Sequence, residues 1–137
     1  SAEEYRDVIR RIRDCVPDAA ITTDIIVGFP GETEAEFEET VTLTEEIGFS
    51  RLHVFPFSAR QGTPAARMEG QIPKTTKNQR VERLSSLGHD LAMRYHKSLV
   101  GKAVTILVEN SPDGHLIGFT DDYVRVQALH ARVHHRL

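Results

Sequence analysis

A short loop in the first quarter of the chain holds the residues best placed for ligand chemistry. The sequence Gly-Phe-Pro-Gly-Glu occupies residues 28–32. It follows an apolar, β-branched run at 21–27 that predicts a buried strand. It precedes Thr33, which with Glu36 would begin a helix as a capping box. Because ligands of α/β folds bind at the carboxyl ends of the strands, we predict that this loop forms one wall of a ligand site.

A purely structural alternative remains for the same loop. Gly28 and Gly31 would then only shape a tight turn, and Glu32 would only interact with the helix dipole. Two phosphate-binding motifs fail here. No Gly-Lys pair follows, as G-x-x-x-x-G-K-[ST] requires, and the two glycines do not supply the spacing of G-x-G-x-x-G. Glu32 also disfavours a phosphate, so the loop suits a ligand with hydroxyl or amino groups.

Hydrolytic and metal chemistry find little support, and we assign no catalytic residue and no metal ligand. No Ser lies in a G-x-S-x-G motif, and the histidines before the tail do not suggest a triad. Cys15 is the only cysteine, which excludes a disulfide or an all-cysteine cluster site within the chain. His130 and His134 could bind a metal on a helix, but no carboxylate or thiolate is near them. We expect the tail at 128–137 to be disordered.

The composition is that of a globular protein with an uneven distribution of charge. The 137 residues carry a net charge of −3 and are 39% hydrophobic, with no apolar run long enough for a membrane span and no signal peptide. We therefore expect a cytoplasmic protein without membrane contact. Residues 1–50 hold four Lys/Arg and thirteen Asp/Glu, whereas residues 51–100 hold nine and three. The basic segment favours a polyanionic partner, although a solvated helix face would look the same.

The hydrophobic pattern of the first half predicts helix, strand, helix, strand. Ser1 would begin a helix that ends near Cys15, and strands are expected at 20–27 and 51–57. Between them, 34–47 predicts a helix that Gly48 ends, with Glu45 and Glu46 placed unfavourably for its dipole. This order is a β/α unit with parallel strands, so the Gly28 turn and the end of the second strand should share one edge. Two strands suggest a slice of a larger barrel or open sheet.

The second half begins with a long connection and then changes its period. Residues 58–73 lack periodicity and carry Arg60 and Arg67 at the same sheet edge as the Gly28 loop. Thr75 or Thr76 would begin a long, basic helix. From residue 102 the apolar residues alternate, which predicts an antiparallel meander through 127.

Two motifs in this chain resemble a known family. Residues 24–33 (DIIVGFPGET) and 53–68 (HVFPFSARQGTPAARM) resemble the later part of the radical S-adenosylmethionine methylthiotransferases. The second motif is closest to the branch that acts on threonylcarbamoyladenosine beside the tRNA anticodon. From Gly101 onward the chain is similar to the start of the family's TRAM domain, a small β-barrel that binds RNA. The resemblance extends to about Gln127.

The resemblance implies a fold, a reaction and two cofactors. The fold would be α/β, a portion of a partial (β/α) barrel followed by a small antiparallel, OB-like segment. S-adenosylmethionine bound to a [4Fe–4S] cluster would support insertion of a methylthio group into adenine. The cofactor-binding residues carried over are Ile26, Val27 and Gly28 on one strand and Val54, Phe55 and Pro56 on the other. Since iron–sulfur clusters need thiolate ligands, this C-terminal fragment should be inactive alone.

The same resemblance implies tRNA as partner and four regions. These are barrel (1–73), linker helix (74–100), partial TRAM domain (101–127) and tail (128–137). Arg60 and Arg67 are candidates for the substrate side, and Lys77, Arg80, Arg83 and Arg125 for phosphate contacts. Two alternatives stay open: a non-catalytic RNA-binding module, and a methylthiotransferase that acts on a ribosomal protein. Open strand edges also predict self-association of the fragment.

Overall fold

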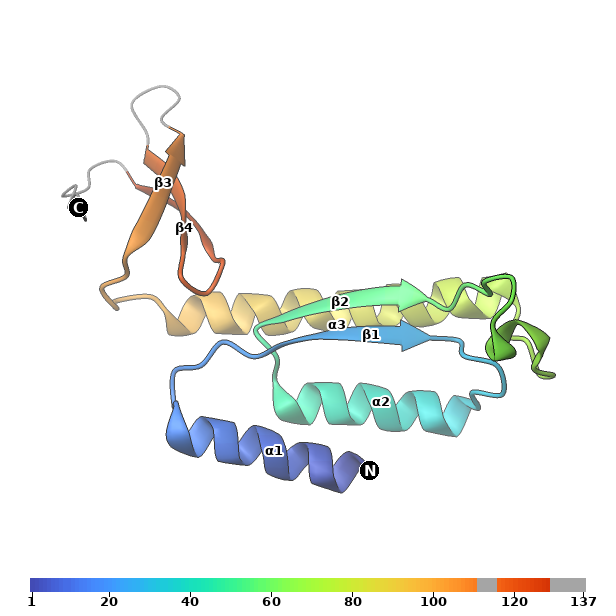
Figure 1. Ribbon diagram of the computed structural model, residues 1–137. Helices are drawn as coiled ribbons and strands as arrows, with labels where there is room; N and C mark the ends of the chain where they lie inside the picture. Colours follow the sequence, from blue (N-terminus) through green and yellow to red (C-terminus); the bar gives the residue numbers. More distant parts are fainter. Residues whose placement is uncertain (111–115, 129–137) are drawn as a thin grey trace. The chain divides into compact units, whose positions relative to one another are not determined.

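The computed structural model describes residues 1–110 and 116–128, and the histidines of the tail lie outside them. Figure 1 shows an α/β chain that divides into two compact units, Ser1–Tyr95 and His96–Leu137. The first unit contains a two-stranded parallel sheet and the second a three-stranded antiparallel sheet. Within the described ranges, no helix combines the length and the hydropathy that a membrane span requires.

The first helix, α1 (Ala2–Cys15), begins and packs as its sequence predicts. The Ser1 side chain accepts a hydrogen bond from the Glu4 backbone N–H, and the Glu4 carboxylate accepts one from the Ser1 backbone nitrogen, so both halves of a capping box are present. Ile9 is the buried residue of its apolar stripe and packs with Ile47 and Phe49. The helix therefore packs against the carboxyl end of the next helix, α2 (Glu34–Ile47), and the residues that directly follow it.

The helix α2 (Glu34–Ile47) has the bounds that the sequence predicts. Thr33 caps it with Glu36, and Gly48 ends it in the left-handed conformation at φ 64°. Hydrogen bonds from the Thr33 backbone and side chain lower the pKa of Glu36. Lys74–Ser98 forms the long helix α3.

The two carboxylates at the unfavourable end of α2 are explained by partners from other helices. Arg6 Nε of α1 lies 2.9 Å from Glu46 Oε2, and Arg94 of α3 lies 3.6 Å from Glu45 Oε1. Both pairs are exposed enough that each contributes little stability by itself.

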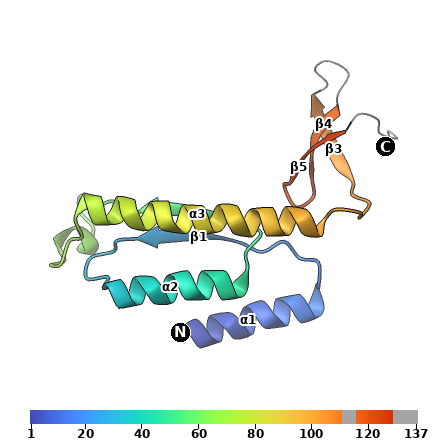
Figure 2. The same cartoon turned by 180° about the vertical axis from the view of Figure 1, so that it is seen from behind.

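The strands β1 (Thr22–Val27) and β2 (Arg51–Pro56) are parallel, and Val27 pairs with Pro56. Their side chains alternate between two faces. On the inner face, Val27 forms a core cluster with Phe37 of α2 and Leu84 of α3. Both helices thus cover the same face of the sheet, as the two opposite views in Figures 1 and 2 show. The outer face carries exposed side chains, including Ile26 and Phe55.

The sequence analysis predicted that α3 begins at Thr75 or Thr76, and the structure differs from this prediction. The helix begins at Lys74, and both threonines lie in its first turn. The physical reason is the preceding proline, since the carbonyl of Pro73 accepts the first helical hydrogen bond from the Lys77 backbone at 3.0 Å. The helix also packs on the sheet, where Gly88 lets its backbone approach Leu52. A short 3₁₀ helix, η1 (Pro64–Arg67), lies within the connection before it.

The second unit is an antiparallel meander of β3 (Ile106–Asn110), β4 (Leu116–Thr120) and β5 (Arg125–Ala128). The strands pair in chain order, with a bulge between Val108 and Asn110. The first strand starts later than the alternation from residue 102 predicts. Gly118 is required where β4 passes β3, because a Cβ there would lie 2.2 Å from the Leu107 carbonyl oxygen.

Candidate functional site

The site lies where the two parallel strands end. Since Val27 pairs with Pro56, the glycine turn and the connection at 57 leave the sheet at the same edge, as predicted. The backbone N–H of Phe57 extends the pairing by donating to the Val27 carbonyl at 2.7 Å. The Phe29 and Phe57 rings meet edge to face with centroids 5.1 Å apart. The sequence therefore located this edge correctly from strand order alone.

The glycine turn is held by two further hydrogen bonds. Gly28 has φ 74° and donates its N–H to Glu32 Oε2 at 2.5 Å. Gly31 has φ 87° and donates its N–H to the carbonyl of Gly70 at 2.9 Å, so the connection returns to the turn. Both conformations favour glycine because a Cβ is strained at positive φ. The structure thus gives Glu32 a definite partner, whereas the sequence left its role open.

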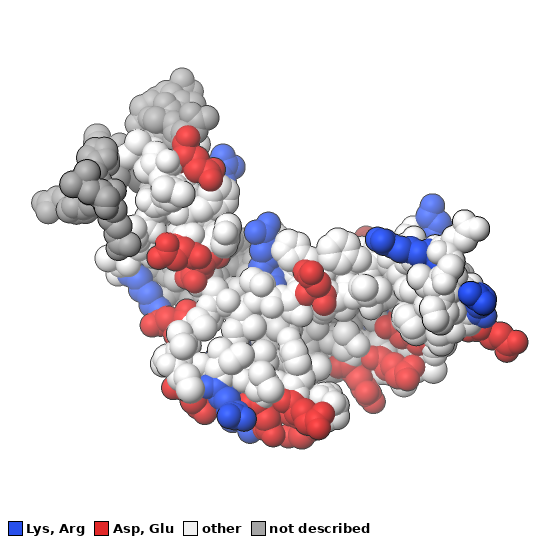
Figure 3. Space-filling view, viewed as in Figure 1, with Lys and Arg blue, Asp and Glu red and all other residues white. Residues whose placement is uncertain are grey.

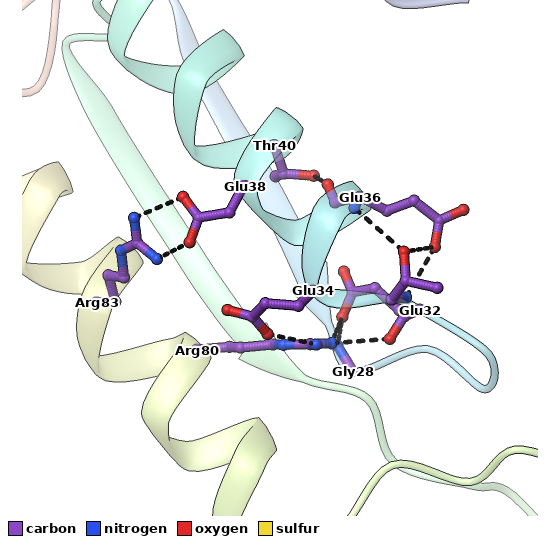
Figure 4. A network of polar contacts seen from close by, with 9 residues as sticks. Gly28, Glu32, Glu34, Glu36, Glu38, Thr40, Arg80 and Arg83 are labelled. Atoms are coloured by element: carbon purple, nitrogen blue, oxygen red, sulfur yellow. Dashed lines mark hydrogen bonds and ion pairs between the residues drawn. The ribbon is translucent and has the colours of Figure 1, made fainter.

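Arg80 of α3 completes the network that Glu32 begins (Figure 4). Its Nη1 lies 2.6 Å from Glu32 Oε2 and 3.2 Å from the Glu32 carbonyl oxygen. Its Nη2 lies 2.9 Å from Glu34 Oε2, and its guanidinium stacks over the Phe37 ring at 5.1 Å. Burial opposes the charge on Arg80, but the hydrogen bonds to both carboxylates outweigh it and raise the pKa of the guanidinium.

Two other basic residues of α3 are also engaged. Lys77 Nζ donates to the Phe57 carbonyl at 3.0 Å, and its aliphatic stem covers Gly28. Arg83 forms a two-point contact with the Glu38 carboxylate, with Nη2 2.7 Å from Oε2. The hydrogen bond from Arg83 lowers the pKa of Glu38. Lys77, Arg80 and Arg83 lie on successive turns of α3, and their side chains contact the segments after the strands or the residues of α2.

These contacts bear on the predicted phosphate-binding residues. Arg80 is 5% exposed, and its guanidinium already faces two carboxylates, so its side chain does not offer the open cation that the sequence analysis assigned to it. Arg83 is about half exposed and shares its charge with Glu38. Arg60, Arg67 and Arg125 are exposed, and their roles stay predictions.

The distribution of charge follows the elements of the first unit. Figure 3 shows both charges side by side on the surface of α1, whereas Lys and Arg gather at the end where the 58–73 connection lies; α2 carries Glu but no Lys or Arg. Sequence analysis could have found the α2–α3 contacts from the spacing of charged residues on the two helices. Glu34 and Glu38 lie four residues apart on one helix, and Arg80 and Arg83 lie three apart on the other, which is the spacing of facing charged stripes.

The predicted cofactor residues divide between the two faces of the sheet. Ile26 and Phe55 lie on the outer face and are 60% and 49% exposed, respectively. Val27 is fully buried against the helices, and Val54 packs on the same inner cluster, so only their backbone could meet a ligand on the outer face. The exposed side chains of Ile26 and Phe55 offer an apolar surface to a flat ring such as adenine. Gly28, which the sequence analysis also assigned to the cofactor, is buried beneath the Lys77 stem and already donates its N–H to Glu32.

An iron–sulfur cluster does not fit the residues of this chain. Cys15 is its only cysteine and ends α1, on the amino-terminal side of β1, whereas the glycine turn follows the carboxyl end of that strand. Among the described residues, no group of three His, Cys, Asp or Glu side chains could hold a metal ion. Any cluster near this site would need thiolates from outside the chain.

Fold and site together define an α/β unit with a candidate ligand site at its strand ends, followed by a small antiparallel sheet. No protein-family model matches the chain. It is 44% identical over 131 residues to the threonylcarbamoyladenosine tRNA methylthiotransferase MtaB of Thermotoga maritima, covering 95% of this chain and 30% of that protein. It is 43% identical over 129 residues to the Bacillus subtilis protein of the same name, covering 90% of this chain and 29% of that protein.

A second group of relatives carries a different name. The chain is 50% identical over 107 residues to the tRNA-2-methylthio-N(6)-dimethylallyladenosine synthase of Saccharopolyspora erythraea, covering 78% of this chain and 22% of that protein. The chain is therefore homologous to one part of the tRNA methylthiotransferase family, and the resemblance seen in the two motifs is confirmed. It spans less than a third of the length of these relatives.

Proposed function

We propose that this chain is the part of a radical S-adenosylmethionine tRNA methylthiotransferase that contributes two cofactor-facing strands and the start of an RNA-binding module. One observation carries the proposal: identity of 44% over 95% of the chain to a tRNA methylthiotransferase. The parallel strands that end at one edge support it, because that edge is where α/β folds bind ligands.

The residues of the chain would have distinct roles at this edge. Ile26 and Phe55 would pack on the adenine of S-adenosylmethionine, and the exposed backbone at Pro56 would meet its polar edge. When bound to a cluster held by another part of the protein, S-adenosylmethionine supplies the radical chemistry for methylthio insertion. Arg60 would lie toward the substrate, because it is exposed on the connection that leaves this edge.

The modified nucleoside would be threonylcarbamoyladenosine in tRNA. The second motif of the sequence supports this choice, because it is closest to that branch. Over nearly the whole chain, relatives with that name are 44% and 43% identical, whereas two dimethylallyladenosine synthases are 38% and 39% identical. A deletion strain tests this assignment by mass spectrometry of its tRNA nucleosides and ribosomal proteins. We expect loss of the methylthio group from threonylcarbamoyladenosine alone. Loss of the methylthio group from dimethylallyladenosine or from a ribosomal protein would identify that molecule as the substrate instead. If no methylthio group is lost, the proposal is rejected.

Contacts to tRNA phosphates can be tested through salt dependence. Each lost phosphate contact flattens the plot of log affinity against log salt by about one unit. In the whole protein we expect Arg125→Gln to reduce the slope in this way, because its side chain is exposed. Arg80→Met should leave the slope unchanged, because its charge is neutralised by Glu32 and Glu34. Unchanged slopes for Arg125→Gln would remove that residue from the RNA contacts.

A non-catalytic RNA-binding module is the second candidate. It is favoured by a hollow in the antiparallel sheet lined by Leu107, Phe119 and Tyr123, since exposed aromatic side chains can stack on bases. Glu109 and Asp121 line the same hollow and would repel phosphates. Titration of labelled tRNA with the isolated chain separates the candidates, because tight binding favours the module and weak binding favours a part of an enzyme.

A further inference from the structure

The first turns of α3 contact the ends of both strands through polar side chains. We propose that Lys77 and Arg80 are positioning residues for S-adenosylmethionine, because they fix the backbone at the carboxyl ends of β1 and β2. This inference rests on the proposed function. We call Lys77, Arg80 and Glu32 the α3 clamp.

The β1 side of the α3 clamp is a chain of three groups. A single oxygen, Glu32 Oε2, accepts both the Gly28 N–H at 2.5 Å and Arg80 Nη1 at 2.6 Å. The side chains of Arg80 and Glu32 are only 6% and 14% exposed, respectively, so this charged pair is weakly screened by solvent. Removal of the Arg80 charge would leave the Glu32 carboxylate buried with only the Gly28 amide, whereas removal of the Glu32 charge would leave Arg80 paired with Glu34 alone. The Gly28 amide is therefore oriented by a residue 52 positions later in the chain.

The β2 side depends on Lys77. Its Nζ donates to the Phe57 carbonyl at 3.0 Å, one residue beyond the end of β2. Its stem lies so close to Gly28 that a Cβ at this glycine would be 2.2 Å from Lys77 Cγ. A single side chain thus contacts the segments that follow both strands. These segments directly follow the ends of the strands that carry Ile26 and Phe55, the side chains that would pack on the adenine.

The neighbouring ion pair between Arg83 and Glu38 provides a structural control for the α3 clamp. Arg83 and Glu38 join α3 to α2 with both side chains near half exposure, and their ion pair involves neither the turn nor the strand ends. Glu32→Gln and Glu38→Gln therefore make a matched pair. Each removes one carboxylate charge from an α3 ion pair, but only the first alters a partner of the Gly28 amide.

The test measures binding of S-adenosylhomocysteine, which keeps the adenine, to the whole protein without tRNA. Arg80→Met, Lys77→Met and Glu32→Gln should each weaken binding by about tenfold, the effect of losing one charge-assisted hydrogen bond that holds the site. Glu38→Gln and Arg94→Met should change binding less than about twofold, because their ion pairs lie away from the turn. In turnover assays, the KM for S-adenosylmethionine should rise while the KM for tRNA stays constant in Glu32→Gln, whose position makes no proposed RNA contact.

A second readout keeps the inference testable if one variant fails to fold. Amide hydrogen exchange at Gly28 should become about tenfold faster in Glu32→Gln and Arg80→Met and remain unchanged in Glu38→Gln. Arg80→Lys should restore part of the probe affinity, because its charge can still reach Glu32. Wild-type affinity in folded Arg80→Met and Lys77→Met would overturn the inference while leaving the proposed function intact. If the wild-type protein itself does not bind the probe, the proposed function fails first.

Discussion

The two units of this chain differ in how their sheets are supported. In Ser1–Tyr95, Val27, Phe37 and Leu84 are fully buried, because two helices cover one face of the parallel strands. Among the described residues of 96–128, no large apolar side chain is fully buried, and Leu107 and Tyr123 are 75% and 77% exposed, respectively. Burial of apolar surface is the main source of stability, so the first unit should account for most of the free energy of unfolding.

The two sheets also differ in how much of their faces must be covered. A parallel pair needs cover on its faces, and here only one face has it, which leaves Ile26 and Phe55 exposed on the other. An antiparallel meander can keep one face in water, so the second sheet forms with little core of its own. The parallel sheet has two strands, fewer than the three or more of an independently stable sheet, and the three strands of the antiparallel sheet are too few for a closed barrel. Both counts agree with a chain that spans less than a third of the length of its relatives.

The largest expected effect contrasts a core leucine with an exposed one. Leu84→Ala should lower the free energy of unfolding by about 2–5 kcal/mol, because the side chain is fully buried between α3 and the sheet. Leu107→Ala should change it by less than about 0.5 kcal/mol. Urea denaturation followed by circular dichroism measures both. Equal losses for the two variants would contradict the assignment of the core to the first unit.

A glycine substitution should break the second unit without affecting the first. Gly118→Ala would place a Cβ 2.2 Å from the backbone oxygen of Leu107, and displacing a paired strand should cost about 1–3 kcal/mol. We expect faster amide exchange in β3 and β4, with unchanged exchange in β1 and β2. Gly62→Ala is a contrasting variant, because the added Cβ meets no neighbouring atom within 4 Å and is strained only by the positive φ. Loss of protection throughout the chain would show that the units unfold together.

A cap substitution tests how far the first unit depends on local contacts. Thr33→Ala removes the side chain that accepts the Glu36 N–H at 3.2 Å and should cost about 1 kcal/mol. Because Thr33 directly follows the clamp residue Glu32, this loss should also speed exchange at the start of α2. The control is Thr40→Ala, whose hydroxyl donates to a carbonyl within the helix. Identical thermal midpoints for the wild-type and Thr33→Ala proteins would argue against the cap.

The smallest effect concerns pH. The hydrogen bond from Arg83 lowers the pKa of Glu38 below its ordinary value of 4.5 in the folded protein. A carboxyl with a lowered folded pKa adds stability that is present above its unfolded pKa and is lost as the pH falls through the folded pKa. Glu38→Gln should therefore lower the thermal midpoint slightly at pH 7 and converge with the wild type in acid. A constant difference from pH 7 to pH 2 would assign the effect to packing.

Much of the local structure was determined by the sequence. The bounds of α2 and the caps at Ser1, Thr33 and Gly48 agree with the prediction, because capping involves residues no more than four positions apart. The parallel pairing and the shared strand edge also follow from element order. The prediction that Thr75 or Thr76 begins α3 was wrong. The helix begins at Lys74, because the Pro73 carbonyl accepts its first helical hydrogen bond.

Only the tertiary structure decided which charges are free and which sheet face is open. The sequence assigned Arg80 to phosphate, but folding places it beside Glu32 and Glu34, 48 and 46 residues away. Likewise, Ile26 and Val27 are neighbours of similar chemistry, and the cover of α2 and α3 on one face alone makes the first exposed and the second buried. Such contacts depend on how distant elements pack, and local propensity contains no information about that packing.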